Sequence, residues 1–172
     1  YGVAKRAVLD YLRVYRELHD LEFCALALAN VYGPGQDSLG EAGVVAIFAE
    51  RLLSGRACTI FGSGQQTRDF VFVDDVVDAL VRAVDRGGGL VINIGSGVST
   101  SILELHRLMS ELAGSDTPPI MGPPRLGELE HNCLDCRRAE VHLGWRPWTR
   151  LEEGLSATLA WVAETQRKRS SR

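Results

Sequence analysis

Two continuous apolar runs constrain the fold of this chain more than any other feature of its sequence. Residues 23–29 and 90–94 are almost wholly apolar and lack the polar–apolar alternation of a half-exposed strand. Such runs are typical of parallel strands that are covered on both faces. Segments with the helical spacing of apolar residues lie before and between them. Strands therefore alternate with helices, and we predict a fold of the α/β class.

The other expected elements follow from local patterns. Helices are expected over 3–19, 44–54, 74–86, 101–113, 135–143 and 151–168, strands over 23–29, 59–61, 68–73, 90–94 and briefly near 119–121, and loops over 30–43 and 114–134. Asp74 and Asp135 are expected to cap the helices that follow them. Ser101 and Glu104 form a capping-box pattern, which indicates a helix start.

Length, charge and cysteine content exclude several classes of protein. A chain of 172 residues is about one domain long. Its net charge of −3 gives no general attraction to a nucleic-acid backbone. The longest stretch without a charge, residues 87–103, is rich in Gly and Ser and is no membrane span. Four cysteines suit a reducing compartment, so we expect a cytoplasmic protein without nucleic-acid or membrane partners.

Tyr1 and Lys5 lie one helical turn apart at the start of the chain, on one face of the first expected helix. A nearby ammonium group lowers the pKa of a tyrosine from its ordinary value of about 10. Such a pair can take a proton from a sugar hydroxyl near neutral pH, while an ordinary surface pair is the alternative. Because the chain opens inside a helical pattern and not at Met, we expect further chain upstream.

Six further motifs follow this pair in order. They are ANVYGPGQ at 29–36, IFGSG at 60–64, QTRDFVFVDDV at 66–76, VINIGSG at 91–97 with Ser99 and Thr100 behind it, PPRLG at 123–127 and LGWRP at 143–147. In this order and spacing the chain resembles the extended short-chain dehydrogenase/reductases. Within them it is similar to the NAD-dependent nucleotide-sugar epimerase/dehydratase family, of the UDP-glucose 4-epimerase type. The resemblance runs from Tyr1 to about Trp161.

The resemblance implies a division of the chain and an activity. Residues 1–43 would be the C-terminal end of a Rossmann-type domain. Residues 44–165 would mainly form a smaller substrate-binding lobe, with some segments returning to the sheet, and 166–172 would be a basic tail. The intact protein would be a homodimeric enzyme that uses NAD to epimerise a nucleotide sugar through a transient keto-sugar, and this chain alone would be inactive.

Other activities remain open at this stage. The same family contains nucleotide-sugar dehydratases, decarboxylases and reductases, and the residues that distinguish a dehydratase would lie mainly upstream of Tyr1. The alternative that is not an enzyme is a truncated remnant, which binds a nucleotide sugar and catalyses no reaction.

The resemblance also assigns the site residues. Tyr1 would be the catalytic tyrosine and Lys5 its partner, which also holds the nicotinamide ribose. Leu28 stands beside the nicotinamide, where such enzymes often have Tyr. For the substrate, Asn30 would contact the diphosphate, Arg68 and Arg125 would clamp it, Phe61 and Phe70 would lie beside the base and ribose, and Glu128 would replace a ribose-binding Asp. A guanidinium fork suits phosphate oxygens. Asp69 and Asp75 are expected to do structural work.

Some features depart from the family pattern. The glycine-rich dinucleotide fingerprint is absent, since near matches at 62–67 and 95–100 lack the third glycine. The Ser or Thr of the usual catalytic triad would fall before residue 1, and Ala27 stands where relatives commonly carry Arg.

Cys133 and Cys136 offer a competing hypothesis, because their C-x-x-C spacing, with His131 close by, occurs in zinc and redox sites. One such pair supplies only two of the four ligands that structural zinc takes. We therefore expect no metal.

Overall fold

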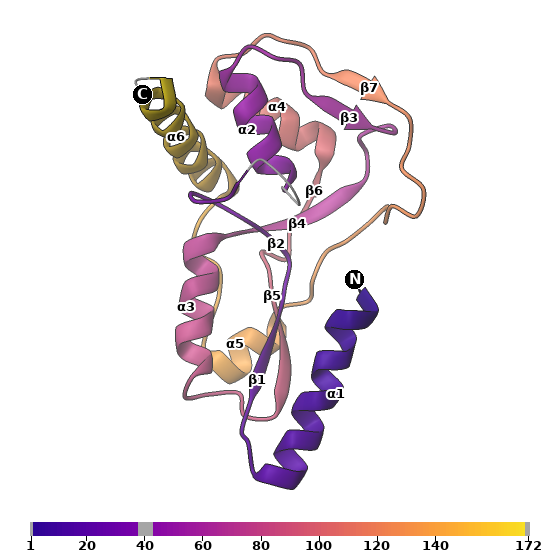
Figure 1. Ribbon diagram of the computed structural model, residues 1–172, viewed down its shortest axis with the longest axis vertical. Coiled ribbons are helices and arrows are strands. Elements are labelled where there is room, and N and C mark those ends of the chain that lie inside the picture. The colour runs from indigo at the N-terminus through magenta and orange to yellow at the C-terminus, as the bar shows by residue number, and fades with distance from the viewer. Residues whose placement is uncertain (1, 38–42, 171–172) are drawn as a thin grey trace.

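The computed structural model describes residues 2–37 and 43–170, which form two lobes arranged along the long axis (Figure 1). The sheet lobe consists of α1, β1, α3, β5 and α5. The helical lobe consists of α2, α4 and α6 with the strands β3 and β7. A three-stranded sheet of β2, β4 and β6 lies between them. Strands alternate with helices along the chain, as expected for the α/β class.

The sheet lobe is built on two parallel strands. β1 (Cys24–Leu28) pairs with β5 (Leu90–Ile94), and these are the two apolar runs of the sequence. α3 (Val73–Ala83) and α5 (Arg137–Leu143) cover one side of the pair, and α1 (Gly2–His19) lies on the other (Figure 1). The core of this lobe is made of Val71, Val76, Ala79, Ile92, Ile94, Ala139, Leu143 and Trp145.

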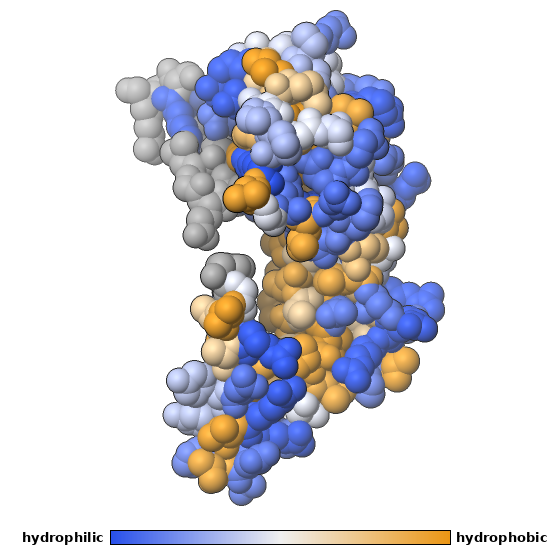
Figure 2. Space-filling view, turned by 90° about the vertical axis from the view of Figure 1, so that its right-hand side faces the viewer, coloured by the Kyte–Doolittle hydropathy of each residue, from blue (hydrophilic) through white to orange (hydrophobic). Residues whose placement is uncertain are grey.

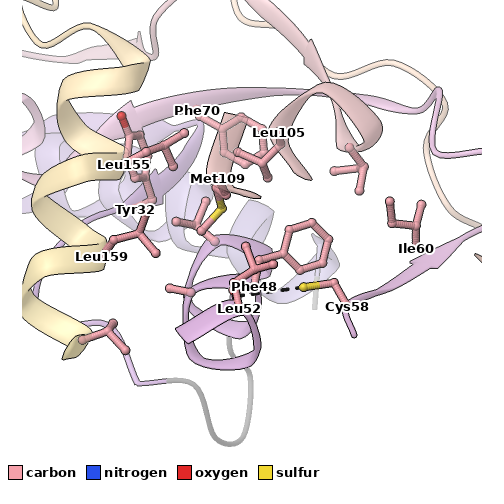
Figure 3. Packing of buried hydrophobic residues seen from close by; sticks show 14 of the residues in the cluster. Tyr32, Phe48, Leu52, Cys58, Ile60, Phe70, Leu105, Met109, Leu155 and Leu159 are labelled. Carbon is pink, nitrogen blue, oxygen red and sulfur yellow. Dashed lines mark hydrogen bonds between the residues drawn. The ribbon is translucent and has the colours of Figure 1, made fainter. Parts of the chain in front are cut away.

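The helical lobe packs three helices around its own core. α2 (Val44–Leu53), α4 (Ile102–Ala113) and α6 (Leu151–Ser170) contact one another, and β3 (Thr59–Phe61) pairs in parallel with β7 (Ile120–Gly122) at the edge. Figure 3 shows Leu155 and Leu159 of α6 on one side of this core and Ile60 of β3 on the other. Ser101 Oγ accepts a hydrogen bond from the Glu104 N–H at 3.1 Å, which confirms the predicted start of α4.

The central sheet separates the two cores. β4 (Thr67–Phe72) pairs in parallel with β2 (Asn30–Tyr32) and antiparallel with β6 (Ser99–Ser101). Phe70 and Phe72 belong to the core of the helical lobe, whereas Val71 belongs to the core of the sheet lobe. Successive side chains of a strand point to opposite faces, so β4 is a wall shared by both cores.

Several boundaries differ from those expected. β2 and β6 lie in segments for which no strand was predicted, because their pairing with β4 decides their conformation. Asp74 does not cap α3, which begins at Val73 after Phe72 without a side-chain cap. Asp135 also precedes its helix by two residues and accepts the N–H of Arg137 at 3.1 Å. α6 continues to Ser170, through most of the expected tail.

α1 contains no buried residue among those described. Its exposed apolar side chains are Val3, Val8, Tyr11, Val14, Tyr15 and Leu18. Figure 2 shows α1 standing out from the rest of the protein, beside an apolar surface that lies over the strands of the sheet lobe. Near the end of α1, Nε of Arg16 lies 3.2 Å from Oε1 of Glu22. The guanidinium of Arg16 occupies the space that a side chain at Gly89 would need. No helix in the described part of the chain has the length and apolarity to cross a membrane.

His106 is buried in α4 with one ring nitrogen unsatisfied among the described residues. Its side chain is 6% exposed, and its ring meets that of Phe48 edge to face with centroids 5.6 Å apart. Nδ1 lies 3.5 Å from Ser110 Oγ, while Nε2 has no hydrogen-bond partner there. Burial therefore lowers the pKa of His106 below its ordinary value of 6.5.

We expect the free energy of unfolding to decrease as pH falls from 7 to 5. The unfolded state takes up a proton on His106 at a higher pH than the folded state. Stability is therefore fully present above about pH 6.5 and is lost below it, by at most about 1.4 kcal/mol per pH unit. Urea unfolding measured at several pH values would give this slope. A His106→Leu chain should have a shallower slope, whereas His142→Gln, at an exposed position, should not. Equal slopes for His106→Leu and wild type would contradict the assignment.

Candidate functional site

A cavity of about 410 Å³ lies beside β3, between the ends of segments that are distant in the sequence. Its lining residues are Phe61, Gly62, Ser63, Gln65, Gln66, Pro124, Arg125, Glu128, Leu129, Glu130 and His131. They come from the turn that joins β3 to β4 and from residues 123–132, which we call the cavity strap. The cavity therefore unites three residues predicted to bind substrate: Phe61, Arg125 and Glu128.

An aromatic ring and a guanidinium form one wall of this cavity. Phe61 is the last residue of β3, and Gly62 turns the chain there with φ +66°, a conformation that favours glycine. The guanidinium carbon of Arg125 lies 3.9 Å from the centroid of the Phe61 ring. This cation–π contact holds Arg125 at the cavity.

Arg68 forms an ion pair with Glu128 of the cavity strap. Nη2 of Arg68 lies 3.0 Å from Oε1 of Glu128, and the two side chains are only 14% and 26% exposed. Nη1 of Arg68 donates to the carbonyl oxygens of Leu129 and Thr67, both at 2.8 Å. Arg68 itself is not among the residues that line the cavity, whereas Glu128 is.

Contacts with the start of β4 hold the cavity strap in place. Thr67 N–H donates to the Glu130 carbonyl at 2.8 Å, and Asn132 N–H donates to the Thr67 carbonyl at 3.2 Å. Thr67 Oγ1 also lies 3.2 Å from His131 Nδ1. The place of Thr67 and His131 at this site was not predicted from the sequence, because no local pattern indicates a pairing across more than sixty residues.

The remaining predicted site residues lie away from this cavity. Phe70 is 5% exposed in the core of the helical lobe, where its ring meets Tyr32 edge to face, so it does not reach the cavity as expected. Asn30 is exposed at the start of β2, and Leu28 is 45% exposed at the carboxyl end of β1. Lys5 is exposed on α1. Tyr1 lies outside the described residues.

Two buried aspartates do the structural work expected of them. Asp69 is 1% exposed and accepts hydrogen bonds from the N–H and hydroxyl of Ser96, at 2.7 and 2.6 Å, from Gly97 N–H at 3.1 Å and from Leu134 N–H at 3.2 Å. It thereby joins β4 to the turn after β5 and to the chain just beyond the cavity strap.

Asp75, at the start of α3, is fully buried and accepts the hydroxyl of Thr149 at 2.9 Å and its N–H at 3.3 Å. Its carbonyl accepts Trp145 Nε1–H at 2.8 Å. These bonds tie the chain before α6 to the sheet lobe.

Cys136, the second cysteine of the C-x-x-C pair, has the properties of a structural thiol, whereas Cys133 is exposed. Burial is the main cause that raises the pKa of Cys136 to about 11, so this thiol is protonated at neutral pH. Its Sγ–H faces the Leu134 carbonyl at 3.8 Å. Within residues 2–37 and 43–170, no group of three or more His, Cys, Asp or Glu side chains could hold a metal ion.

Comparison with known proteins matches residues 1–95 to the model of the "NAD dependent epimerase/dehydratase family". A UDP-glucose 4-epimerase of Mycolicibacterium smegmatis is 52% identical over 92% of this chain and 51% of its own length. A putative UDP-glucose 4-epimerase of Methanocaldococcus jannaschii is 39% identical over 97% of this chain and 54% of its own length.

Among solved structures, the UDP-glucose 4-epimerase of Thermotoga maritima with UDP-glucose superposes with a TM-score of 0.95 and 44% identity. The match covers 96% of this chain and 54% of that one. The Thermus thermophilus UDP-glucose 4-epimerase complex with NAD superposes with a TM-score of 0.86 and 37% identity. This match covers 94% of this chain and 53% of that one. The chain thus spans about half the length of the relatives it matches. Because the family model covers more than half of the chain, the resemblance is confirmed: this chain belongs to the NAD dependent epimerase/dehydratase family.

Proposed function

We propose that the intact protein epimerises a nucleotide sugar, as a UDP-glucose 4-epimerase does, through a transient keto-sugar and with NAD as cofactor. The observation that carries the proposal is the cavity beside β3, where Phe61, Arg125 and Glu128 meet. An aromatic ring, a guanidinium and a carboxylate suit a base, a diphosphate and ribose hydroxyls, respectively. The relatives named UDP-glucose 4-epimerase, at 52% and 39% identity, favour this activity over that of a UDP-glucuronic acid decarboxylase, at 30%.

In this proposal the cavity holds the nucleotide part of the substrate. The base lies against Phe61, Arg125 binds the diphosphate, and Glu128 accepts hydrogen bonds from the ribose. Arg68 and Asn30 contribute further contacts to the diphosphate. Phe70 supports β4 from the core of the helical lobe and makes no contact with the ligand.

The residues of the sheet lobe fit one edge of a site for NAD. Leu28 is 45% exposed at the carboxyl end of a parallel strand, which is where open α/β sheets bind their ligands. Lys5 is accessible on α1, as a residue that holds a ribose hydroxyl must be. When bound, NAD supplies the transient oxidation of the sugar carbon.

Proton transfer falls to the first residues of the chain. Tyr1 takes the proton of the sugar hydroxyl, and the ammonium of Lys5 lowers the pKa of the tyrosine, which makes this transfer feasible near neutral pH. This part of the proposal rests on the sequence spacing of the two residues.

We also propose a homodimer in the cytoplasm for the intact protein. The exposed apolar side chains of α1, such as Val3, Tyr11 and Leu18, support an interface on this helix. The four cysteines, all free thiols, support a reducing compartment.

The activity can be tested by incubating the intact protein with UDP-glucose. We expect the sugar to be inverted at C4, which proton NMR detects directly. Arg125→Ala should raise KM about ten- to a hundredfold, because charge-assisted hydrogen bonds to the diphosphate contribute about 1.5–3 kcal/mol. The turnover number should change much less, since Arg125 does not contact the reacting carbon.

Arg107→Ala is the matched control, because Arg107 is exposed on α4, pairs with Glu111 at 2.7 Å and lies outside the cavity. Its KM should equal that of the wild type. Release of carbon dioxide or loss of water from a nucleotide sugar, without inversion, would contradict the epimerase proposal and favour another activity of the family.

A further inference from the structure

Both terminal nitrogens of the Arg68 guanidinium, Nη1 and Nη2, make hydrogen bonds within the protein itself. Nη2 faces the carboxylate of Glu128 at 3.0 Å, and Nη1 donates to the carbonyls of Leu129 and Thr67. With a side chain only 14% exposed, this guanidinium lies under the cavity strap and does not line the cavity. While these contacts persist, Glu128 holds the position on Nη2 that a diphosphate oxygen would take.

Glu128 connects the guanidinium to the cavity. Glu128 is one of the residues that line the cavity, and its carboxylate contacts Arg68, which does not line it. A carboxylate offers a guanidinium the same pair of anionic oxygens that a phosphate does. Glu128 and a bound diphosphate would therefore compete for the same donor, Nη2 of Arg68.

We propose that the Arg68–Glu128 ion pair is a latch that the diphosphate of a nucleotide opens. Without ligand, Glu128 occupies Arg68 as an internal anion. A bound diphosphate takes its place, and the released carboxylate turns toward the cavity, where ribose hydroxyls would lie. The inference rests on the proposed function, because it takes the cavity to be a nucleotide site.

The opening is confined to one side chain. The cavity strap keeps its other attachments to β4, namely Arg68 Nη1 to the Leu129 carbonyl and the backbone bond from Thr67 to Glu130. Arg125 also keeps its position over Phe61. Because a phosphate offers Arg68 the anionic oxygens that Glu128 supplies, the latch favours ligands that carry phosphate over the nucleoside alone.

The test compares two neighbouring glutamates in this chain. Glu128→Gln removes the competing charge, and we expect inorganic pyrophosphate to bind about tenfold tighter, the worth of one charge-assisted hydrogen bond. UDP should also bind tighter, but by less, because the variant loses the charged acceptor for the ribose hydroxyls. Glu130→Gln is the matched control, because Glu130 lines the same cavity, is exposed and makes the same change of charge. Isothermal titration calorimetry of both ligands against wild type and both variants measures the difference, with circular dichroism as the check on folding.

A second variant separates the effect of the Arg68–Glu128 contact from the effect of the negative charge on residue 128. Glu128→Asp keeps the negative charge but shortens the side chain, so the contact with Arg68 is weakened and both ligands should bind tighter than to wild type. This variant also serves if Glu128→Gln does not fold.

The outcomes that overturn the latch are distinct from failure of the proposed function. If Glu128→Gln and Glu130→Gln bound the ligands equally more tightly than wild type, the effect would come from the lost negative charge and not from the contact with Arg68. Weaker UDP binding with unchanged pyrophosphate binding would make Glu128 a ribose ligand only, so the nucleotide site would stand and the latch would fall. Absence of UDP binding in wild type and in Glu128→Gln would overturn both.

Discussion

Turnover of UDP-glucose by the intact protein is expected to fall at least about a hundredfold when Tyr1 is replaced by phenylalanine. The substitution removes the phenolic proton-transfer group and leaves the ring, and general acid–base catalysis contributes typically about 10²–10⁴-fold to rate. The substrate KM should barely change, because the nucleotide is held in the cavity beside β3. Steady-state kinetics of wild type and Tyr1→Phe would measure both effects.

Tyr11→Phe is the control for this experiment. Tyr11 is 68% exposed on the same helix, and its hydroxyl is given no role in proton transfer. The Tyr11→Phe protein should keep the wild-type turnover number. Near-normal turnover in Tyr1→Phe would refute the role of Tyr1 as the base.

Replacing Trp145 with alanine is expected to lower the free energy of unfolding by about 3–5 kcal/mol, the usual cost of truncating a buried aromatic residue. The indole is 1% exposed in the core of the sheet lobe, and its N–H donates to the Asp75 carbonyl at 2.8 Å. The substitution leaves a cavity and removes the hydrogen bond to the Asp75 carbonyl. Urea unfolding of this chain, followed by far-ultraviolet circular dichroism, measures the loss.

Trp148 provides a matched comparison three residues along. Its side chain is 57% exposed, so Trp148→Ala should change the free energy of unfolding by no more than about 0.5 kcal/mol. Similar losses in the two variants would mean that Trp145 is not a core residue. The loss of unfolding free energy in Trp145→Phe should lie between those of Trp145→Ala and Trp148→Ala, because phenylalanine keeps most of the buried volume and loses the hydrogen bond.

The elements that the sequence predicts well are those whose signals are local. The apolar runs at 23–29 and 90–94 are parallel strands, and the pair Ser101 and Glu104 marks a helix start. β2 and β6 were missed because each is three residues long and forms only against β4. Asp74 and Asp135 are residues of a type that caps helices well. Even so, each of the two helices begins at a neighbouring residue.

The candidate site was predicted in part. Phe61, Arg125 and Glu128 meet at one cavity although more than sixty residues separate the first from the others. Phe70 was expected beside them, but its place in β4 turns it into the helical lobe. The pairing of Arg68 with Glu128 could not be predicted, because a sequence motif gives residue types and not which partner a guanidinium takes.

The wall shared by the two cores has a consequence for how chains of this family can vary in length. Residues 70, 71 and 72 of β4 face the helical lobe, the sheet lobe and the helical lobe in turn. One residue inserted or deleted here would exchange the faces of every position beyond it, and so place Phe rings and Val in the wrong cores. Insertions and deletions in homologous chains should therefore fall in the turn before this strand and avoid the strand itself, since α3 begins directly after it.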